Sequence, residues 1–592
     1  MPSLTFGGGL NEADDFNIQM DECIAGQNFL LNKFSKTLRP RPPQDLKGTA
    51  PNSGDIRGIM QLVKTDSTET TIIQAGNTVY EWDGTTFTSR GTVSATAKLR
   101  DTTWALDDFL VITDIEKQTV LQKWDGATLC RLKTEIGNGT VNTLTSLTRT
   151  GTTATATFTL HGYVDGQYVT IADAVETDYN GTFLISNVTA NTFDYTVANS
   201  PTTPATGTIT AEVDDNVYAK YSIVKDGRVW LFNVTTGGAD IPHMMLASTF
   251  EDPEKLDSSE RAVDGTFTTG NEAFYILTKD LKPINGVTVF QNQLIISTED
   301  GRLYKLQGSD ATDYAFVDFY SGSAATGTES MVNIGNDVLY MKSGGAIESL
   351  LSTDKFGDVE ADDVSKWIPD TVAGLSDSLS VYDQQRQQVM FFVNNRVLVF
   401  DKEMFTSTEL SPWSVWITKM GNEFNTNAAK FLRVPGTTNK TVYWGDDAGQ
   451  IFELNGVGEN GDAGTHSILM SRRTKLLVDG DQINDILHGR IEYRRVGNFN
   501  LQMDFEWSDH YSTTTCSVPL KEPVLVGALH WGGATGSYFN ELVYFNGGVL
   551  AQDRVSTAGF TPAGKGESLF LTLTADTTVN FLVNRIYESE RA

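Results

Sequence analysis

Cysteines and long apolar runs are scarce in this chain of 592 residues, and each shortage excludes a class of protein. The three cysteines, Cys23, Cys130 and Cys516, lie far apart, which argues against a disulfide framework or a cysteine-based metal cluster. We expect free, buried thiols. Because no run of about 18 apolar residues occurs, we predict no membrane span. The segment from Met1 to Asp15 lacks both the basic and the apolar region of a secretory signal, so we predict none.

Basic residues are also few. The chain has 45 Lys and Arg against 75 Asp and Glu, which gives a formal net charge of -30. A surface of this sign repels nucleic acid and anionic lipid, because phosphate binding depends on Lys and Arg. The charge fits either simple solubility or a wall along which DNA passes without adhering.

Catalytic and metal-binding motifs are missing as well. None of the six histidines is paired with another histidine or with a cysteine at the spacing of metal ligands. The sequence has no serine-nucleophile elbow, no phosphate-binding P-loop and no dinucleotide-binding glycine motif between a strand and a helix. Acidic segments at 12–15, 444–450 and 479–485 could offer oxygen ligands to calcium, but β-turns are the favoured interpretation. We therefore predict no enzyme activity, no cofactor and no metal.

The rest of the sequence consists of short strand-like runs between glycine-rich turns. Glycine is abundant at 53 residues, and Thr, Val, Tyr and Phe dominate many segments, which predicts an all-β fold. Five runs share the form of a polar turn, an aromatic strand and a second polar turn. They are "NTVYEWDG" (77–84), "VLQKWDG" (120–126), "DGRLYKLQGSD" (300–310), "NRVLVFDKE" (395–403) and "AGQIFELNG" (448–456). Repeated hairpins of this kind are typical of β-propeller blades, with an ordinary antiparallel sandwich as the alternative.

Composition changes divide the chain into four parts. Residues 141–212 hold one basic residue, Arg149, and many threonines in alternating strands, which predicts an inserted immunoglobulin-like β-sandwich. From about Ser471 the strands become long and alternating, which predicts a C-terminal β-sandwich. The predicted organisation is an extended leader at 1–58, a propeller-like body at 59–140 and 213–470, the insert at 141–212, and the C-terminal domain at 471–592.

The leader reverses the local charge. Its prolines exclude a regular helix near residue 40, although a short helix is possible around Glu22–Phe34. Seven basic residues stand between Leu30 and Lys64 against two acidic ones. The functional interpretation is an arm that docks on an acidic adaptor or neighbouring subunit, and the alternative is a solvated surface. The docking candidates are Lys33, Lys36, Arg39, Arg41 and Lys47.

Tryptophans offer a second functional interpretation. Six of them stand in predicted strands or turns: Trp82, Trp124, Trp230, Trp413, Trp416 and Trp444. Such residues anchor small β cores, which is the favoured interpretation, or stack on sugars in a carbohydrate-binding module.

The leader "GGLNEADDFNIQMDECIAGQNFLL", the following "TIIQAGNTVYEWDGTTFTSRGTV", and "LSPWSVW" (410–416) after a "VFD" strand resemble a family of phage virion proteins. This is the tail nozzle family of short-tailed bacteriophages, also called tail tubular protein B or packaged-DNA stabilisation protein. The resemblance implies a hexameric ring below the tail adaptor, possible contacts with tail fibres or a needle, and a channel that retains packaged DNA and conducts it at ejection.

From the resemblance we expect a structural virion protein that is assembled in the host cytoplasm and does not bind DNA specifically. A propeller-fold adhesin or depolymerase that binds carbohydrate is the main alternative. A minor capsid or baseplate protein of another virion is a further one.

Overall fold

The computed structural model describes residues 6–13, 18–19, 22–31, 38–256, 267, 270–308, 311–322, 324–350, 362–407, 410–417, 424–454, 468–474, 477–478, 489–495, 499–507, 512–520, 529–531, 537–539, 556–560, 568–577 and 581–588. The chain forms two compact units. The middle unit is Ala50–Asn336, and the terminal unit combines Met1–Thr49 with Asp337–Ala592. Strands dominate both units, which confirms the predicted all-β class.

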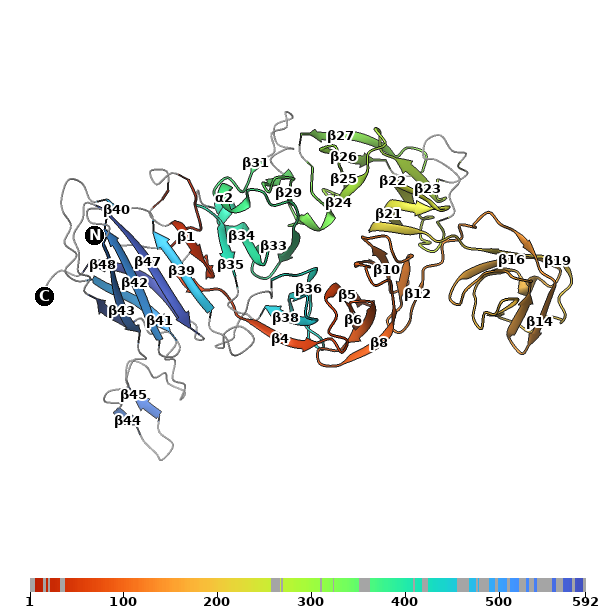
Figure 1. The fold of residues 1–592 in the computed structure, drawn as a ribbon, viewed down its shortest axis with the longest axis horizontal. Helices are drawn as coiled ribbons and strands as arrows, with labels where there is room; N and C mark the ends of the chain where they lie inside the picture. Colours follow the sequence, from red (N-terminus) through yellow and green to blue (C-terminus); the bar gives the residue numbers. More distant parts are fainter. Residues whose placement is uncertain are drawn as a thin grey trace. The chain divides into compact units, whose positions relative to one another are not determined.

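The described part of the middle unit contains four antiparallel meanders of four strands each (Figure 1). The first meander is β5 (Ile56–Val63), β6 (Glu69–Ala75), β7 (Thr78–Trp82) and β8 (Phe87–Thr92), and the second is β9 (Leu99–Trp104), β10 (Phe109–Asp114), β11 (Gln122–Trp124) and β12 (Leu129–Arg131). The third is β20 (Tyr218–Lys225), β21 (Arg228–Thr236), β22 (Ala239–Ala247) and β23 (Phe274–Leu277). The fourth is β24 (Ile284–Phe290), β25 (Gln293–Thr298), β26 (Arg302–Gln307) and β27 (Ala315–Ser321). Strands consecutive in the chain are neighbours in each sheet, as in a propeller blade, and this confirms the propeller-like prediction.

The insert lies between β12 and β20 and consists of two sheets. One has the order β13 (Asn142–Thr143), β19 (Gly207–Val213), β16 (Tyr168–Ala174) and β17 (Gly181–Leu184), and the other has β14 (Ser146–Thr150), β15 (Thr153–Thr157) and β18 (Thr192–Thr196). Side chains of both sheets share one core, which includes Leu147, Val169, Phe193 and Ala211. The insert is thus a small β-sandwich, and its immunoglobulin-like character stays a prediction.

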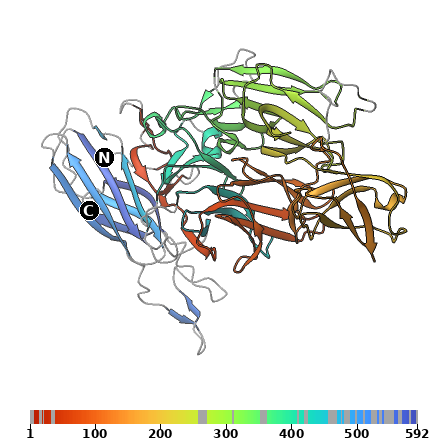
Figure 2. The ribbon, with the colours of Figure 1, turned by 45° about the vertical axis from the view of Figure 1, so that its right-hand side comes forward.

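The terminal unit adds further meanders and two sheets near the C-terminus. One meander is β32 (Leu379–Asp383), β33 (Gln388–Val393), β34 (Arg396–Asp401) and β35 (Trp413–Trp416), and another is β36 (Ala428–Arg433), β37 (Lys440–Gly445), β38 (Gln450–Leu454) and β4 (Gln44–Thr49). The larger C-terminal sheet has the order β1 (Cys23–Gln27), β39 (Ile468–Thr474), β47 (Ser568–Thr577), β42 (Phe499–Trp507) and β43 (Ser512–Leu520), and the smaller has β46 (Ser556–Phe560), β41 (Gly489–Arg495) and β48 (Phe581–Glu588). Figure 2 shows the long strands of the larger sheet side by side.

The five aromatic runs recognised in the sequence occupy one place in the fold. Each is the third strand of its meander, namely β7, β11, β26, β34 and β38. The two "WDG" copies also fold alike: the carboxylate of Asp83 accepts hydrogen bonds from the amides of Thr85 and Thr86, and that of Asp125 from Ala127 and Thr128. Gly84 and Gly126 follow with φ of 98° and 93°, which glycine adopts without strain.

The leader differs from the extended arm that the sequence predicts. Strand β1 adds to the edge of the larger C-terminal sheet by pairing with β39, and β4 completes the meander of β36–β38. The short helix considered possible around Glu22–Phe34 does not form in its described part, residues 22–31, where the chain makes β1 and β2 (Phe29–Leu30) and Asn28 between them has a φ of 58°. The pairing partners lie more than 400 residues away, so no local pattern revealed them.

Candidate functional site

The docking candidates of the leader divide into three groups in the structure. Lys33 and Lys36 lie outside the described residues. Arg39 belongs to β3 (Arg39–Pro40), which pairs with β2, and its side chain is not described. Arg41 and Lys47 are described in full, and both contact other residues of the chain.

Arg41 is buried, with 2% of its surface exposed. Its Nε donates to the Asn28 side chain at 3.0 Å, and its two terminal nitrogens donate to the carbonyl oxygens of Pro42 at 2.9 Å and Ile417 at 3.2 Å. The guanidinium also lies 5.6 Å from the ring centre of Phe424. The planar fork of donors therefore holds together segments distant in sequence, so Arg41 stabilises the fold of its own chain, and its docking role stays a prediction.

Lys47 is one-third exposed and lies on β4. Its ammonium is 2.6 Å from a carboxylate oxygen of Glu453 on β38, the strand that pairs with β4, and 4.0 Å from Asp45. The lysine thus neutralises acidic neighbours within its own sheet. Arg41 and Lys47, the two docking candidates whose side chains are described, both hold the leader against other parts of the chain.

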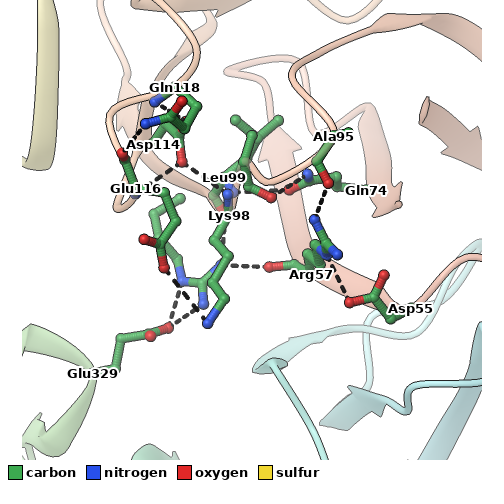
Figure 3. A network of polar contacts seen from close by, with 12 residues as sticks. Asp55, Arg57, Gln74, Ala95, Lys98, Leu99, Asp114, Glu116, Gln118 and Glu329 are labelled. Carbon is green, nitrogen blue, oxygen red and sulfur yellow. Dashed lines mark hydrogen bonds and ion pairs between the residues drawn. The ribbon is translucent and has the colours of Figure 1, made fainter. Parts of the chain in front are cut away.

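A network of polar contacts in the middle unit was not predicted from the sequence (Figure 3). Arg100, on β9, donates from Nε to a carboxylate oxygen of Glu329 at 2.5 Å, although the two residues are 229 positions apart. The same guanidinium donates to the backbone oxygens of Arg57 at 2.6 Å and Leu99 at 2.7 Å. One arginine thereby connects β5, β9 and the 3-10 turn Thr328–Ser330.

Neighbouring side chains extend this network (Figure 3). The Nε of Arg57 lies 2.6 Å from the carboxylate of Asp55, and Gln74 accepts the amide of Leu99 at 2.8 Å. Asp114 is 1% exposed, and its carboxylate accepts the backbone amides of Lys98, Glu116, Gln118 and Thr119 at 2.8–3.0 Å. Because each charge meets an opposite charge or several backbone dipoles, the network fixes loops and offers no poised acid–base pair.

The six tryptophans lie in the cores of their meanders. Trp124, Trp230 and Trp413 are fully buried, Trp416 and Trp444 are 1% exposed, and Trp82 is 2% exposed. The indole nitrogen of Trp124 donates to the Thr70 hydroxyl at 2.9 Å, and that of Trp413 donates to the carbonyl oxygen of Val364 at 2.8 Å. None of these six rings has a face available to stack on a sugar.

The acidic segments and cysteines show no ligand chemistry in the described ranges. Asp446 accepts the amides of Ala448 at 3.0 Å and Gln450 at 2.7 Å, which is turn chemistry, whereas 479–485 lies outside the described residues. Within those ranges no three His, Cys, Asp or Glu side chains are grouped to hold a metal ion. Burial raises the pKa of Cys23 to about 11, which leaves its thiol protonated and unreactive at neutral pH.

Among the described residues, no helix has both the length and the apolar character needed to cross a membrane.

Comparison with known proteins finds similarity in structure only. No family model matches the chain, and no curated protein matches it in sequence. Among solved structures, YCF48 bound to D1 peptide is 9% identical over 70% of this chain and 95% of its own, with a TM-score of 0.35. The Cps50 (Swd1) β-propeller domain of Myceliophteria thermophila is 12% identical over 69% of this chain and 99% of its own, with a TM-score of 0.27. Identities and TM-scores this low assign no function.

Proposed function

We propose that the chain is a structural subunit of a virion, the tail nozzle of a short-tailed bacteriophage. In this role several copies form a ring around a channel, which retains packaged DNA and conducts it at ejection. The sequence resemblance of the leader and of "LSPWSVW" suggests the family. A ring of this kind needs a stiff subunit, a surface that does not retain DNA, and two different complementary faces for head-to-tail contact.

The burial of the six tryptophans is the observation that supports this proposal most directly. A carbohydrate-binding adhesin would present aromatic faces to its ligand, but these residues anchor the cores. A buried arginine supports the same conclusion. Arg228 donates to the backbone oxygens of Ser248 at 2.5 Å, Gly270 at 2.7 Å and Glu272 at 2.8 Å. Tryptophan and arginine side chains, which could recognise a ligand at a surface, are buried here and stabilise the fold instead.

The charge supports an inert channel wall. With a formal net charge of -30, the surface repels phosphates. Several cations that could bind DNA are already paired, such as Lys123 with Glu254 at 3.0 Å and Lys47 with Glu453 at 2.6 Å. DNA that moves past such a wall would form few contacts with it, so few contacts would have to break during ejection.

The experiment is to mix the purified full chain with purified adaptor protein and to follow assembly by sedimentation velocity. We expect a complex of defined, ring-like mass. In parallel, a gel-shift assay with duplex DNA at low salt should show no retention, and a glycan array should show no binding. Glycan binding or hydrolysis together with failure to assemble would favour the adhesin and reject the nozzle.

A further inference from the structure

Exposed aliphatic side chains concentrate on the insert. Among the described residues, ten large hydrophobic side chains are exposed, and five of them belong to this small domain. Four form what we call the apolar patch, and their exposed fractions are 78% for Leu160, 61% for Val141, 51% for Val164 and 42% for Leu184. Single exposed apolar residues are ordinary, whereas a cluster of them marks a candidate surface for binding a partner.

Hydrogen bonds place the patch at one end of the insert. Asn142, next to Val141, donates to the hydroxyl of Tyr163 at 3.3 Å, which brings Val141 to the loop between β15 and β16. In the same loop the amide of Gly166 donates to the carbonyl oxygen of Ile185 at 3.0 Å, beside Leu184. The patch therefore joins segments from β13, the β15–β16 loop and the end of β17.

The loop that carries the patch is held firmly. The amide of Leu160 donates to the Asn191 side chain at 3.0 Å, and the amide of Tyr163 donates to Nδ1 of His161 at 3.0 Å. Behind them the rings of His161, Tyr163 and Phe193 pack with centre-to-centre distances of 4.8–5.6 Å. A surface built in advance loses little entropy when a partner binds.

The charge of the insert indicates the chemistry of that partner. The insert has six acidic residues and one basic residue, Arg149. The Arg149 guanidinium donates to carbonyl oxygens of its own domain, including Gly151 and Ser200 at 3.0 Å each. The acidic groups accept bonds from neutral donors: Asp165 accepts the amide of Val188, and Asp194 accepts the hydroxyl of Thr155. No cation of the described chain forms an ion pair with an acidic residue of the insert.

We propose that the apolar patch is a docking surface for a protein segment that combines apolar residues with Lys or Arg. Nucleic acid and anionic membranes are repelled by the acidic insert, and the insert of a second copy, which carries the same charge, is repelled as well. Exposed aliphatic side chains, with Asp165 in the same loop and six acidic residues against one basic residue in the domain, fit a basic, amphipathic segment. This inference does not depend on the nozzle proposal.

The test measures binding of the full chain to labelled peptides by fluorescence anisotropy. The probes are a peptide that alternates leucine and lysine, one that alternates leucine and glutamate, and one that alternates serine and lysine. We expect binding of the leucine–lysine peptide to be strongest and to fall about tenfold in the double variant Leu160→Ser/Val164→Ser, because central apolar contacts dominate such interfaces. Both side chains are exposed, so the variant should fold normally.

Leu106→Ser provides the matched control. Leu106 is 65% exposed and precedes Asp107 and Asp108, but it belongs to the β9–β10 turn and not to the insert. We expect it to leave the affinity unchanged. Equal loss in the control and in the double variant, no loss in the double variant, or equal binding of the serine–lysine peptide would overturn the proposal. Self-association that disappears in the double variant would identify a second copy as the occupant and would also overturn it.

Discussion

Leu46 of β4 lies opposite Phe452 of β38, so the leader supplies the fourth strand of a meander whose other three strands lie about 400 residues later. This relationship changes the expected behaviour of a truncated chain. A detachable arm could be removed without loss of fold, but a strand of a sheet could not.

Deletion of residues 1–49 should therefore destabilise the protein. It removes β4 and β1, and it exposes the edges of β38 and β39 together with buried residues such as Phe452. We expect loss of solubility or a decrease of more than about 4 kcal/mol in the free energy of unfolding, the range of exceptional changes. Urea unfolding of the truncated and full chains measures this. A soluble truncated protein of unchanged stability would show that the leader is a free arm after all.

Arg41 and Lys47 should differ sharply in their contribution to stability. Arg41→Ala removes the donor to the Ile417 carbonyl oxygen and one of the two donors to the Asn28 side-chain oxygen, which keeps the amide of Ile417, and we expect a cost of about 3 kcal/mol. Lys47→Ala, the control, breaks a partly exposed ion pair with Glu453 and should cost about 1 kcal/mol or less. Chemical denaturation of the two variants makes the comparison. Equal small costs would show that the contacts of Arg41 do not hold the leader in place.

The Arg100–Glu329 pair offers a second asymmetric test. Arg100 also donates to two backbone oxygens, whereas Gln in place of Glu329 can still accept a hydrogen bond. We expect Arg100→Ala to cost about 3 kcal/mol and Glu329→Gln about 1 kcal/mol. Thermal unfolding of both variants would show the difference, and a larger effect of Glu329→Gln would contradict the assigned roles.

Asp214 should make the base of the insert sensitive to pH. It lies where the chain leaves the insert, and it accepts the amides of Thr134 at 3.2 Å and Glu135 at 3.1 Å. Burial raises its pKa from 3.8 to about 6, although the two backbone hydrogen bonds and Lys133 act in the opposite direction. The folded chain thus holds the proton more tightly, so this stabilisation is complete below pH 3.8 and is lost as the pH rises through 6.

The variant Asp214→Asn removes this titration and keeps one acceptor oxygen. Relative to the wild type, the variant should gain about 2–3 kcal/mol between pH 4 and pH 7. Unfolding at both pH values, with amide exchange at Thr134 and Glu135 as a local probe, measures the effect. If the variant and the wild type respond equally to pH, Asp214 does not titrate in this range.

Features of the fold that depend on local sequence could be predicted, and contacts between distant residues could not. The "WDG" copies around Trp82 and Trp124 predicted repeated hairpins because their turn chemistry is local. The threonine-rich sequence of the insert likewise predicted its strands, because the alternation of apolar and polar residues indicates which side chains face a core. By contrast, the contacts of Arg41 with Ile417 and of Arg100 with Glu329 join residues hundreds of positions apart. The charge of Arg41 suggested a docking residue at the surface, and only the fold shows that this side chain is buried.

Electron microscopy of the negatively stained full chain, mixed with purified adaptor protein, tests the central claim most directly. The claim is that stiff, acidic, propeller-like subunits line a passage for DNA. We predict closed rings with an open channel that stack on the adaptor. Monomers that never associate with the adaptor, or a particle without a channel, would contradict it.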